Sequence, residues 1–294
     1  MNDRKRQVLL TAQRLFVEKG FSATSVQDIL EESKISKGTF YNYFSSKNEC
    51  LLAILERIKV ETSVRRRELL IGRSASSKDI LAEQISIHMQ VSQEQNLLPL
   101  FEAIFHSGDP ELRAFVTKQF KEELSWLSGR IIDIYGEEVT PFAADCTVLL
   151  LGMLQHMTHI WMLLSKGQVD HEKLVHFIIR RMDSIINGMI GTGDIFIGGE
   201  ILFNIDQAKS EKTYSKEQLL FQLDGFQKHL EGETKPEEKQ YIQFLMDELR
   251  EARPRTFLLE TITHSFNNTF TATPHEAEAQ EIASKLWYYA DTIK

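Results

Sequence analysis

The stretch ISKGTFYNYFSSKNE, residues 35–49, decides how the rest of the sequence is interpreted. It holds two tyrosines, two phenylalanines, one glycine and two lysines, in a chain whose formal net charge is −8. A core helix has no use for the lysines, and a surface helix in water has no use for the aromatic rings. We therefore expect this stretch to face another molecule.

The flanking residues predict three short helices in a row. Residues 3–19 carry apolar side chains at helical spacing, and Gly20 follows where a left-handed cap is favoured. Ser25 is a predicted N-cap with Asp28 at the positive end of the next helix, which runs to about residue 33. Ser36 caps a third helix after a tight turn. This order predicts a helix-turn-helix, the DNA-binding arrangement in which the second helix of the pair enters the major groove.

Spacing separates the inner from the outer side chains of the third helix. Ile35, Phe40 and Phe44 are expected to point inward, since Phe40 and Phe44 are four residues apart. Gly38 costs roughly 1 kcal/mol in a helix interior, and less in a first turn, but allows close approach of a bulky partner to the backbone. The remaining faces then carry Lys37, Thr39, Tyr41, Asn42 and Tyr43.

Lys47 follows Ser45 and Ser46, which are expected to cap a fourth, long helix. A lysine beside a helix N-terminus is well placed for a phosphate oxygen, because free N–H groups and the helix dipole favour an anion there. The alternative is a solvated surface lysine.

Charge is unevenly distributed along the 294 residues. Residues 1–47 contain eight bases and five acids, which gives +3, so the remaining chain carries −11. A chain that is 42% hydrophobic and 26% charged is typical of a soluble protein. Cys50 and Cys146 are far apart and show no metal or disulfide pattern, which is typical of a reducing cytosol.

Residues 72–192 are predicted to be helical throughout, with helices at 80–91, 97–105, 111–134, 141–165 and 170–189. The helix at 141–165 is apolar nearly all round. Gln155, His156, Thr158 and His159 interrupt its most apolar part, so we interpret it as a buried helix and expect no membrane association. After a linker at 191–206, further helices are expected to begin near Ser215, Pro236 and Thr273. The fold class is therefore all-α.

The helices at 141–165 and 170–189 are candidates for a four-helix bundle across a dimer axis. A monomeric core is the alternative. The predicted interface consists of Leu150, Leu154, Leu174, Ile178, Met182, Ile185 and Met189.

Residues 8–55 resemble the N-terminal domain of the TetR family of bacterial repressors, through AQRLFVEKGFSATSVQDIL, SKGTFYNYFSSK and NECLLAILE. The resemblance implies a homodimer that places two recognition helices on a double-stranded palindromic operator, and a small-molecule ligand that releases it. It also implies which residues bind DNA: Ser25, Gln27, Lys37, Gly38, Thr39, Tyr41, Asn42 and Tyr43, with Lys47 on phosphate.

The resemblance divides the chain into a helix-turn-helix domain at 1–47, a regulatory and dimerisation domain at 48–192, and an additional helical region at 193–294. The last region extends beyond typical members of the family, and its residues 195–294 are net −6, so we do not expect it to contact DNA. The ligand is expected to be apolar or aromatic. Its predicted pocket residues, for each of which ordinary core packing is the alternative, are His88, Met89, Phe101, Phe105, Phe120, Trp126, Met157 and Trp161.

The predicted function is a ligand-responsive repressor in the bacterial cytoplasm, associated with the nucleoid. We expect no cofactor and no metal, since His156 and His159 lack a third ligand at convincing spacing. The sequence has no G-x-S-x-G, H-E-x-x-H or phosphate-loop motif, so we expect no enzyme. The alternative is a nucleoid- or division-associated protein that binds DNA with low sequence specificity.

Overall fold

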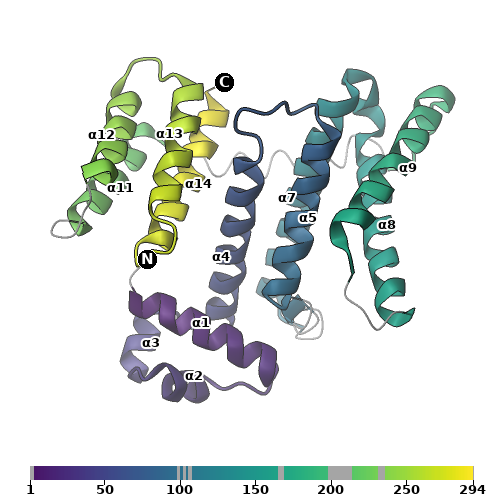
Figure 1. Ribbon diagram of the computed structural model, residues 1–294. Helices are drawn as coiled ribbons and strands as arrows, with labels where there is room; N and C mark the ends of the chain where they lie inside the picture. The colour runs from purple at the N-terminus through teal and green to yellow at the C-terminus, as the bar shows by residue number, and fades with distance from the viewer. Residues whose placement is uncertain are drawn as a thin grey trace. The chain divides into compact units, whose positions relative to one another are not determined.

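The computed structural model describes residues 3–97, 100–101, 104, 108–164, 169–197, 214–230 and 236–293. Within these ranges all regular structure is helical, which confirms the all-α fold class (Figure 1). The chain divides into two compact units. Met1–Ile71 and Lys212–Lys294 form the first unit, and Gly72–Glu211 forms the second.

The first unit begins with the predicted short helices. They are α1 (Asp3–Glu18), α2 (Val26–Ser33) and α3 (Lys37–Tyr43), followed by the long helix α4 (Lys47–Glu68). The three predicted capping serines are confirmed, since the side chains of Ser25, Ser36 and Ser46 each accept a backbone N–H of the helix that follows. Gly20 has a φ of +88°, as expected of a left-handed turn after α1.

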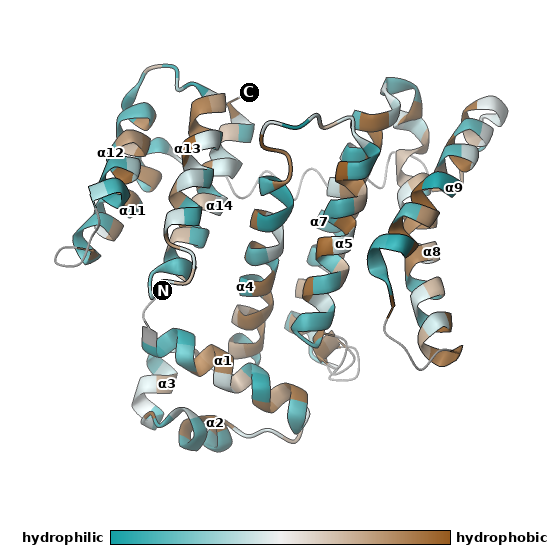
Figure 2. Cartoon of the chain, viewed as in Figure 1, coloured by the Kyte–Doolittle hydropathy of each residue, from teal (hydrophilic) through white to brown (hydrophobic). Residues whose placement is uncertain are grey.

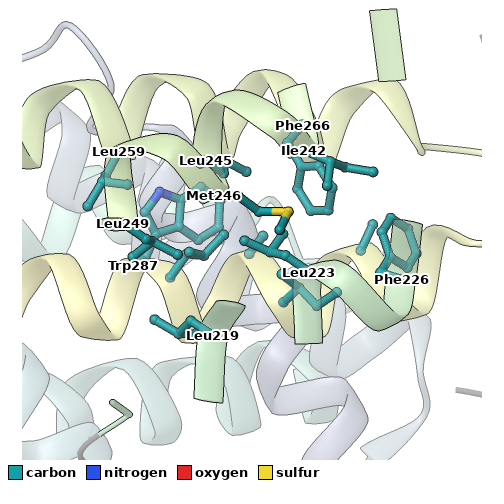
Figure 3. Close-up of a cluster of buried hydrophobic side chains, with 14 of the residues drawn as sticks. Leu219, Leu223, Phe226, Ile242, Leu245, Met246, Leu249, Leu259, Phe266 and Trp287 are labelled. Carbon is teal, nitrogen blue, oxygen red and sulfur yellow. The ribbon is translucent and has the colours of Figure 1, made fainter. Parts of the chain in front are cut away.

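The same unit contains four helices from the end of the chain, α11 (Lys216–His229), α12 (Pro236–Arg250), α13 (Thr256–Thr269) and α14 (Glu276–Thr292). We call these the C-terminal module. Its aromatic and aliphatic core is shown in Figure 3, with Phe226, Phe266 and Trp287 fully buried. The predicted starts at Ser215 and Pro236 are confirmed, whereas α13 is a helix that the sequence patterns did not predict.

Helix α4 connects the two parts of this unit. Its first half packs against α1, while Val64 near its end belongs to the core of the C-terminal module, with Val60 packed beside it. The predicted ranges 1–47, 48–192 and 193–294 therefore do not coincide with the compact units, because α4 and the last helices share one core.

The second unit consists of α5 (Lys78–Glu94), α7 (Pro110–Tyr135), the short 3₁₀ helix η1 (Glu137–Phe142), α8 (Ala143–Leu164) and α9 (His171–Thr192). Its core gathers apolar side chains from all of these elements, including Leu81, Leu127, Val139, Leu150 and Ile178. The helix expected at 97–105 and the linker expected at 191–206 lie largely outside the described residues.

The expectation that the helix at 141–165 would be a buried helix is wrong for most of α8. Its first turns are buried, but Leu149, Trp161 and Leu164 expose 44%, 50% and 83% of their surface. In Figure 2 the ribbon of α8 is coloured brown where its residues are apolar. With η1, α8 is long and apolar enough to cross a membrane by length and composition alone, and one such helix is weak evidence for a membrane. The residues that the structure describes leave this apolar face uncovered.

Candidate nucleic-acid interface

An aromatic and aliphatic core holds α1, α2 and α3 together. Phe16, Ile29, Phe40 and Phe44 are fully or almost fully buried, and the Phe40 and Phe44 ring centroids lie 5.6 Å apart. The inward orientation predicted for Phe40 and Phe44 is confirmed. Anchored in this way, α3 can present its opposite face without losing its own packing.

The start of α2 is stabilised by a complete capping box. The Ser25 Oγ accepts the Asp28 N–H at 3.1 Å, and an Asp28 carboxylate oxygen accepts the Ser25 N–H at 2.7 Å. The Lys19 ammonium, 2.6 Å from the same carboxylate, and the Ser25 hydroxyl and N–H hold the pKa of Asp28 well below its usual range. The carboxylate therefore stays ionised at the positive end of α2.

The turn between α2 and α3 is tight. Lys34 ends α2 in the left-handed region at a φ of +55°, which is uncommon for a residue with a side chain. Ser36 then caps α3 by accepting the Thr39 N–H at 3.1 Å. Two caps on either side of a short turn fix the direction of α3 relative to α2.

The exposed face of α3 carries the residues that the sequence predicted. Lys37, Gly38, Tyr41 and Asn42 are exposed, while Thr39 and Tyr43 are half-buried. Tyr41 exposes 47% of its surface, and the Lys37 ammonium lies 6.0 Å from the centre of its ring. A cation, an amide and hydroxyl groups thus share one face, which is the chemistry needed to contact phosphates and base edges.

Gly38 has no packing reason of its own to be glycine. A Cβ built there would meet only the Ser36 Oγ, at 3.8 Å, which is an ordinary contact. The space beside the first turn of α3 is therefore open for a partner.

Ser25 and Gln27, the predicted contacts on α2, are both exposed. The Ser25 hydroxyl donates to Asp28 at 2.6 Å, and the Gln27 amide donates to Glu31 at 2.8 Å. The Ser25 hydroxyl therefore serves the helix cap, whereas the Gln27 bond joins two side chains on the exposed side of α2.

Lys47 has a structural role that the sequence did not reveal. Its ammonium donates to the backbone oxygens of Phe21 and Thr24, each at 2.7 Å, and lies 4.4 Å from the centre of the Phe21 ring. Partial burial lowers its pKa. An ammonium has three donors, so one remains for a phosphate oxygen, and the phosphate contact stays a prediction.

The residues predicted for a dimer interface lie inside the second unit. Leu150, Leu154, Ile178 and Met182 are buried in its core, while Leu174, Ile185 and Met189 are half-buried against the same core. Periodicity identified the apolar stripe of α9 correctly, but the stripe packs within the same chain. These side chains have little surface left for a second copy.

Other residues of the same two helices are exposed and apolar or small. On α8 they include Val148, Leu149, Gly152 and Ile160, and α9 adds Phe177 and Gly188. A Cβ at either glycine would meet nothing within 4 Å of the surrounding chain. Small residues beside apolar ones allow two helices to approach closely.

The predicted ligand-pocket residues are not gathered in one place that the structure describes. Phe120, Met157 and Trp161 are 56%, 38% and 50% exposed, and His88 is also exposed. Met89 and Trp126 are half-buried and pack against the core of the second unit. Phe101 is half-buried, and Phe105 lies outside the described residues.

The second unit also buries a polar group that the sequence analysis missed. Arg130 is 4% exposed, and its guanidinium donates to Gln84 at 3.0 Å and to Asp133 at 2.6 Å. Its remaining terminal nitrogen is buried without a partner among the described residues. An arginine inside a helix gives no sequence signal of burial, so only the structure identifies it.

The two cysteines are unreactive by position. Both are buried, and burial raises the pKa of the Cys50 thiol to about 12 and that of Cys146 to about 11. Over the described ranges, no group of three or more His, Cys, Asp and Glu side chains is placed to hold a metal ion.

Known proteins resemble this chain both over its helix-turn-helix and well beyond it. Residues 8–54 match the profile of bacterial regulatory proteins of the tetR family. The HTH-type transcriptional regulator YerO of Bacillus subtilis is 27% identical over 276 residues, 92% of this chain and 91% of the relative. The HTH-type transcriptional regulator YuxN of the same organism is 30% identical over 203 residues, 66% of this chain and 67% of the relative. The HTH-type transcriptional repressor NemR of Escherichia coli is 31% identical over 78 residues, 26% of this chain and 39% of the relative.

Proposed function

The chain belongs to the tetR family of bacterial regulatory proteins, and from this premise we propose that it is a homodimeric repressor that a small-molecule ligand releases from a palindromic operator. The observation that carries the proposal is the exposed face of α3, held between two capped helix ends. It combines Lys37, Tyr41 and Asn42 on a helix whose other face is anchored by Phe40.

The contacts of this face divide into two kinds. Asn42 and Lys37 are both exposed and are our candidates for base edges, where amide and ammonium groups distinguish purines. Tyr41, Gln27 and the third donor of Lys47 are assigned to the sugar-phosphate backbone, which sets register without reading sequence. The Gly38 backbone allows this close approach.

The dimer is proposed to form through the exposed faces of α8 and α9. The dimer would bury exposed apolar side chains against a second copy of the chain, namely Val148, Leu149, Ile160 and Phe177. Burial of apolar surface contributes about 25 cal/mol per Å². An isologous contact of this kind also explains why a helix of a regulator leaves large apolar side chains uncovered.

The ligand is proposed to act on the second unit. Met89 and Trp126, half-buried against its core, are the predicted pocket residues best placed to contact an apolar or aromatic molecule. Binding would stabilise one arrangement of the two helix-turn-helix regions of the dimer over another, since a ligand shifts an equilibrium only through differential affinity.

The names of relatives include both a repressor and an activator, NemR and FasR, and we propose repression for this chain.

A regulator of this family acts in the cytoplasm and needs no catalytic centre, and we propose both for this chain. The second candidate function, a low-specificity nucleoid or division protein, differs in one measurable respect. It would bind random and selected duplexes alike, whereas a specific regulator prefers its site by at least about 10³-fold.

The test uses a fluorescein-labelled palindrome that the wild-type chain selects from a random duplex pool. We expect Tyr41→Ala and Asn42→Ala each to weaken binding about tenfold or more, with thermal unfolding unchanged, because both side chains are exposed. Phe257→Ala is the matched control, since Phe257 is 65% exposed but lies on α13. Wild-type affinity in both variants, or no selection of any palindrome, would overturn the proposal.

A further inference from the structure

The C-terminal module packs on the helix that carries the reading head, which we define as α1–α3. The first half of α4 contacts the head, where Arg57 donates to Gln13 on α1 at 2.7 Å. The second half contacts the module, where Val64 is 2% exposed in the core shown in part in Figure 3. One helix thus has a different partner on each half.

Polar contacts fix the end of α4 to two helices of the module. Arg67 pairs with Asp291 near the end of α14. Glu68 accepts a hydrogen bond from the Asn267 amide on α13 at 2.9 Å, and His264 Nδ1 lies 3.6 Å from the same carboxylate. Each of these contacts joins residues that are about two hundred positions apart in the sequence.

Helix α14 also reaches the head. Glu276, its first residue, lies 3.9 Å from the Arg6 guanidinium on α1. Between Glu276 and Asp291 the helix extends over about 22 Å, at 1.5 Å per residue. It therefore has an ion pair with α1 at one end and another with the end of α4 at the other. A tilt of the head against α4 would therefore change the Glu276–Arg6 contact or shift α14.

Helix α13 buries two polar side chains that are incompletely hydrogen-bonded, and one of them, Asn267, bonds Glu68 of α4. Thr263 is fully buried and Asn267 is 5% exposed, yet the Thr263 hydroxyl and the Asn267 carbonyl oxygen have no hydrogen-bond partner in the described part of the chain. The unpartnered oxygen of Asn267 favours separation of α13 from α4, because water would hydrate it. The apolar core around Trp287 and Phe226 would stay intact inside the module when it separates.

From these contacts we propose that the C-terminal module is a detachable brace that fixes the orientation of the reading head on α4 and thereby sets operator affinity. The two heads of a dimer bind together only when each is correctly oriented. If detachment leaves a head correctly oriented for about a tenth of the time, its apparent affinity falls about tenfold, since the apparent dissociation constant scales with the inverse of the competent fraction. The affinity readout rests on the proposed operator binding, whereas the orientation of the head does not.

Two variants should open the brace in the full-length protein. Arg67→Glu repels Asp291, and Val64→Lys places a charge in the apolar part of the contact. One further variant should close it again, and another should stabilise α13 within the module. The double variant Arg67→Glu with Asp291→Arg restores the ion pair in reverse, and Thr263→Val replaces the unpartnered hydroxyl by a methyl group.

The measurements are fluorescence anisotropy with the selected palindrome and hydrogen exchange without DNA, both well below the unfolding temperature. We expect about a hundredfold weaker binding for Val64→Lys and Arg67→Glu, because both heads of the dimer carry the change, and faster exchange in α2 and α3. In the charge swap we expect the affinity for the palindrome to recover to within about twofold of wild type. In Thr263→Val we expect slower hydrogen exchange of α13 and undiminished binding.

Wild-type affinity and wild-type hydrogen exchange of the head in folded Val64→Lys protein would overturn the brace. A wild-type chain that binds no duplex would instead overturn the proposed function, and head exchange would still test the brace.

Discussion

The Lys47 side chain illustrates how a residue expected at a DNA contact can also hold the reading head together. Its ammonium bonds two loop carbonyls and lies over the Phe21 ring. Lys47→Met would leave both oxygens without this donor. We expect the opening free energy of α2 and α3, measured by hydrogen exchange in urea, to fall by about 1–3 kcal/mol, as for hydrogen bonds to charged groups.

Lys19→Met is the matched comparison, because Lys19 also makes a 2.6 Å contact, but to the Asp28 carboxylate near the surface. Exposed ion pairs contribute about 0–1 kcal/mol, so this variant should lose less than Lys47→Met. Equal losses in the two variants would show that the loop contacts of Lys47 add nothing to stability. Weakened DNA binding by Lys47→Met alone therefore does not identify a phosphate contact.

The stability of the reading head should depend on pH through the Asp28 carboxylate. Its pKa is held below the usual value, so its contribution to stability is present above the unfolded pKa, about 3.9, and is lost as pH falls through the folded pKa. Asp28→Asn should therefore unfold at a lower temperature than wild type at pH 7. The difference should shrink steadily below about pH 4 in thermal melts, and a difference that grows in acid would contradict this linkage.

At the scale of helices, local chemistry explains which elements the sequence revealed. The caps at Ser25, Ser36 and Ser46 act over three residues, so they could be predicted before any tertiary contact was known. Helix α13 was missed because it is rich in threonine and its N-cap, Arg255, makes no side-chain cap. Threonine disfavours helix interiors, and here Thr261 bonds back to the Phe257 carbonyl within α13. Tertiary packing decided its structure.

Apolar periodicity likewise identified the stripe on α9 but could not tell which neighbour covers it. Ile178 and Met182 pack in their own unit, while Leu149 of α8 stays exposed. Leu149→Glu should therefore leave the helical circular dichroism unchanged and convert the dimer to a monomer in sedimentation at micromolar concentration. Phe120→Glu, at a 56% exposed position on α7, is the control that should remain dimeric. A Leu149→Glu protein that sediments as wild type would exclude this face.

At the scale of the whole molecule, no local pattern indicates that the last helices return to α4. Arg67 and Asp291 are separated by 224 positions, and a contact of that span depends on the complete fold. The face of α3 could be predicted because all its residues lie within one short segment. The brace, the buried Arg130 and the uncovered face of α8 depend on packing between distant segments. For this reason the sequence alone does not predict them.

The basic head and the acidic remainder together predict how strongly binding depends on two heads. Residues 1–47 carry a net charge of only +3 in a chain of −8, so each half of the dimer makes few phosphate contacts and should bind its half-site weakly. Joining two heads makes the second contact intramolecular and raises affinity by about 10²–10⁴-fold. Wild-type protein should therefore bind the selected palindrome at least about a hundredfold more tightly than a single half-site in anisotropy titrations. Leu149→Glu should bind the two duplexes alike, because a monomer carries one head. A monomeric variant that keeps the preference would mean that one head reads the whole site, which is incompatible with paired contacts in successive grooves.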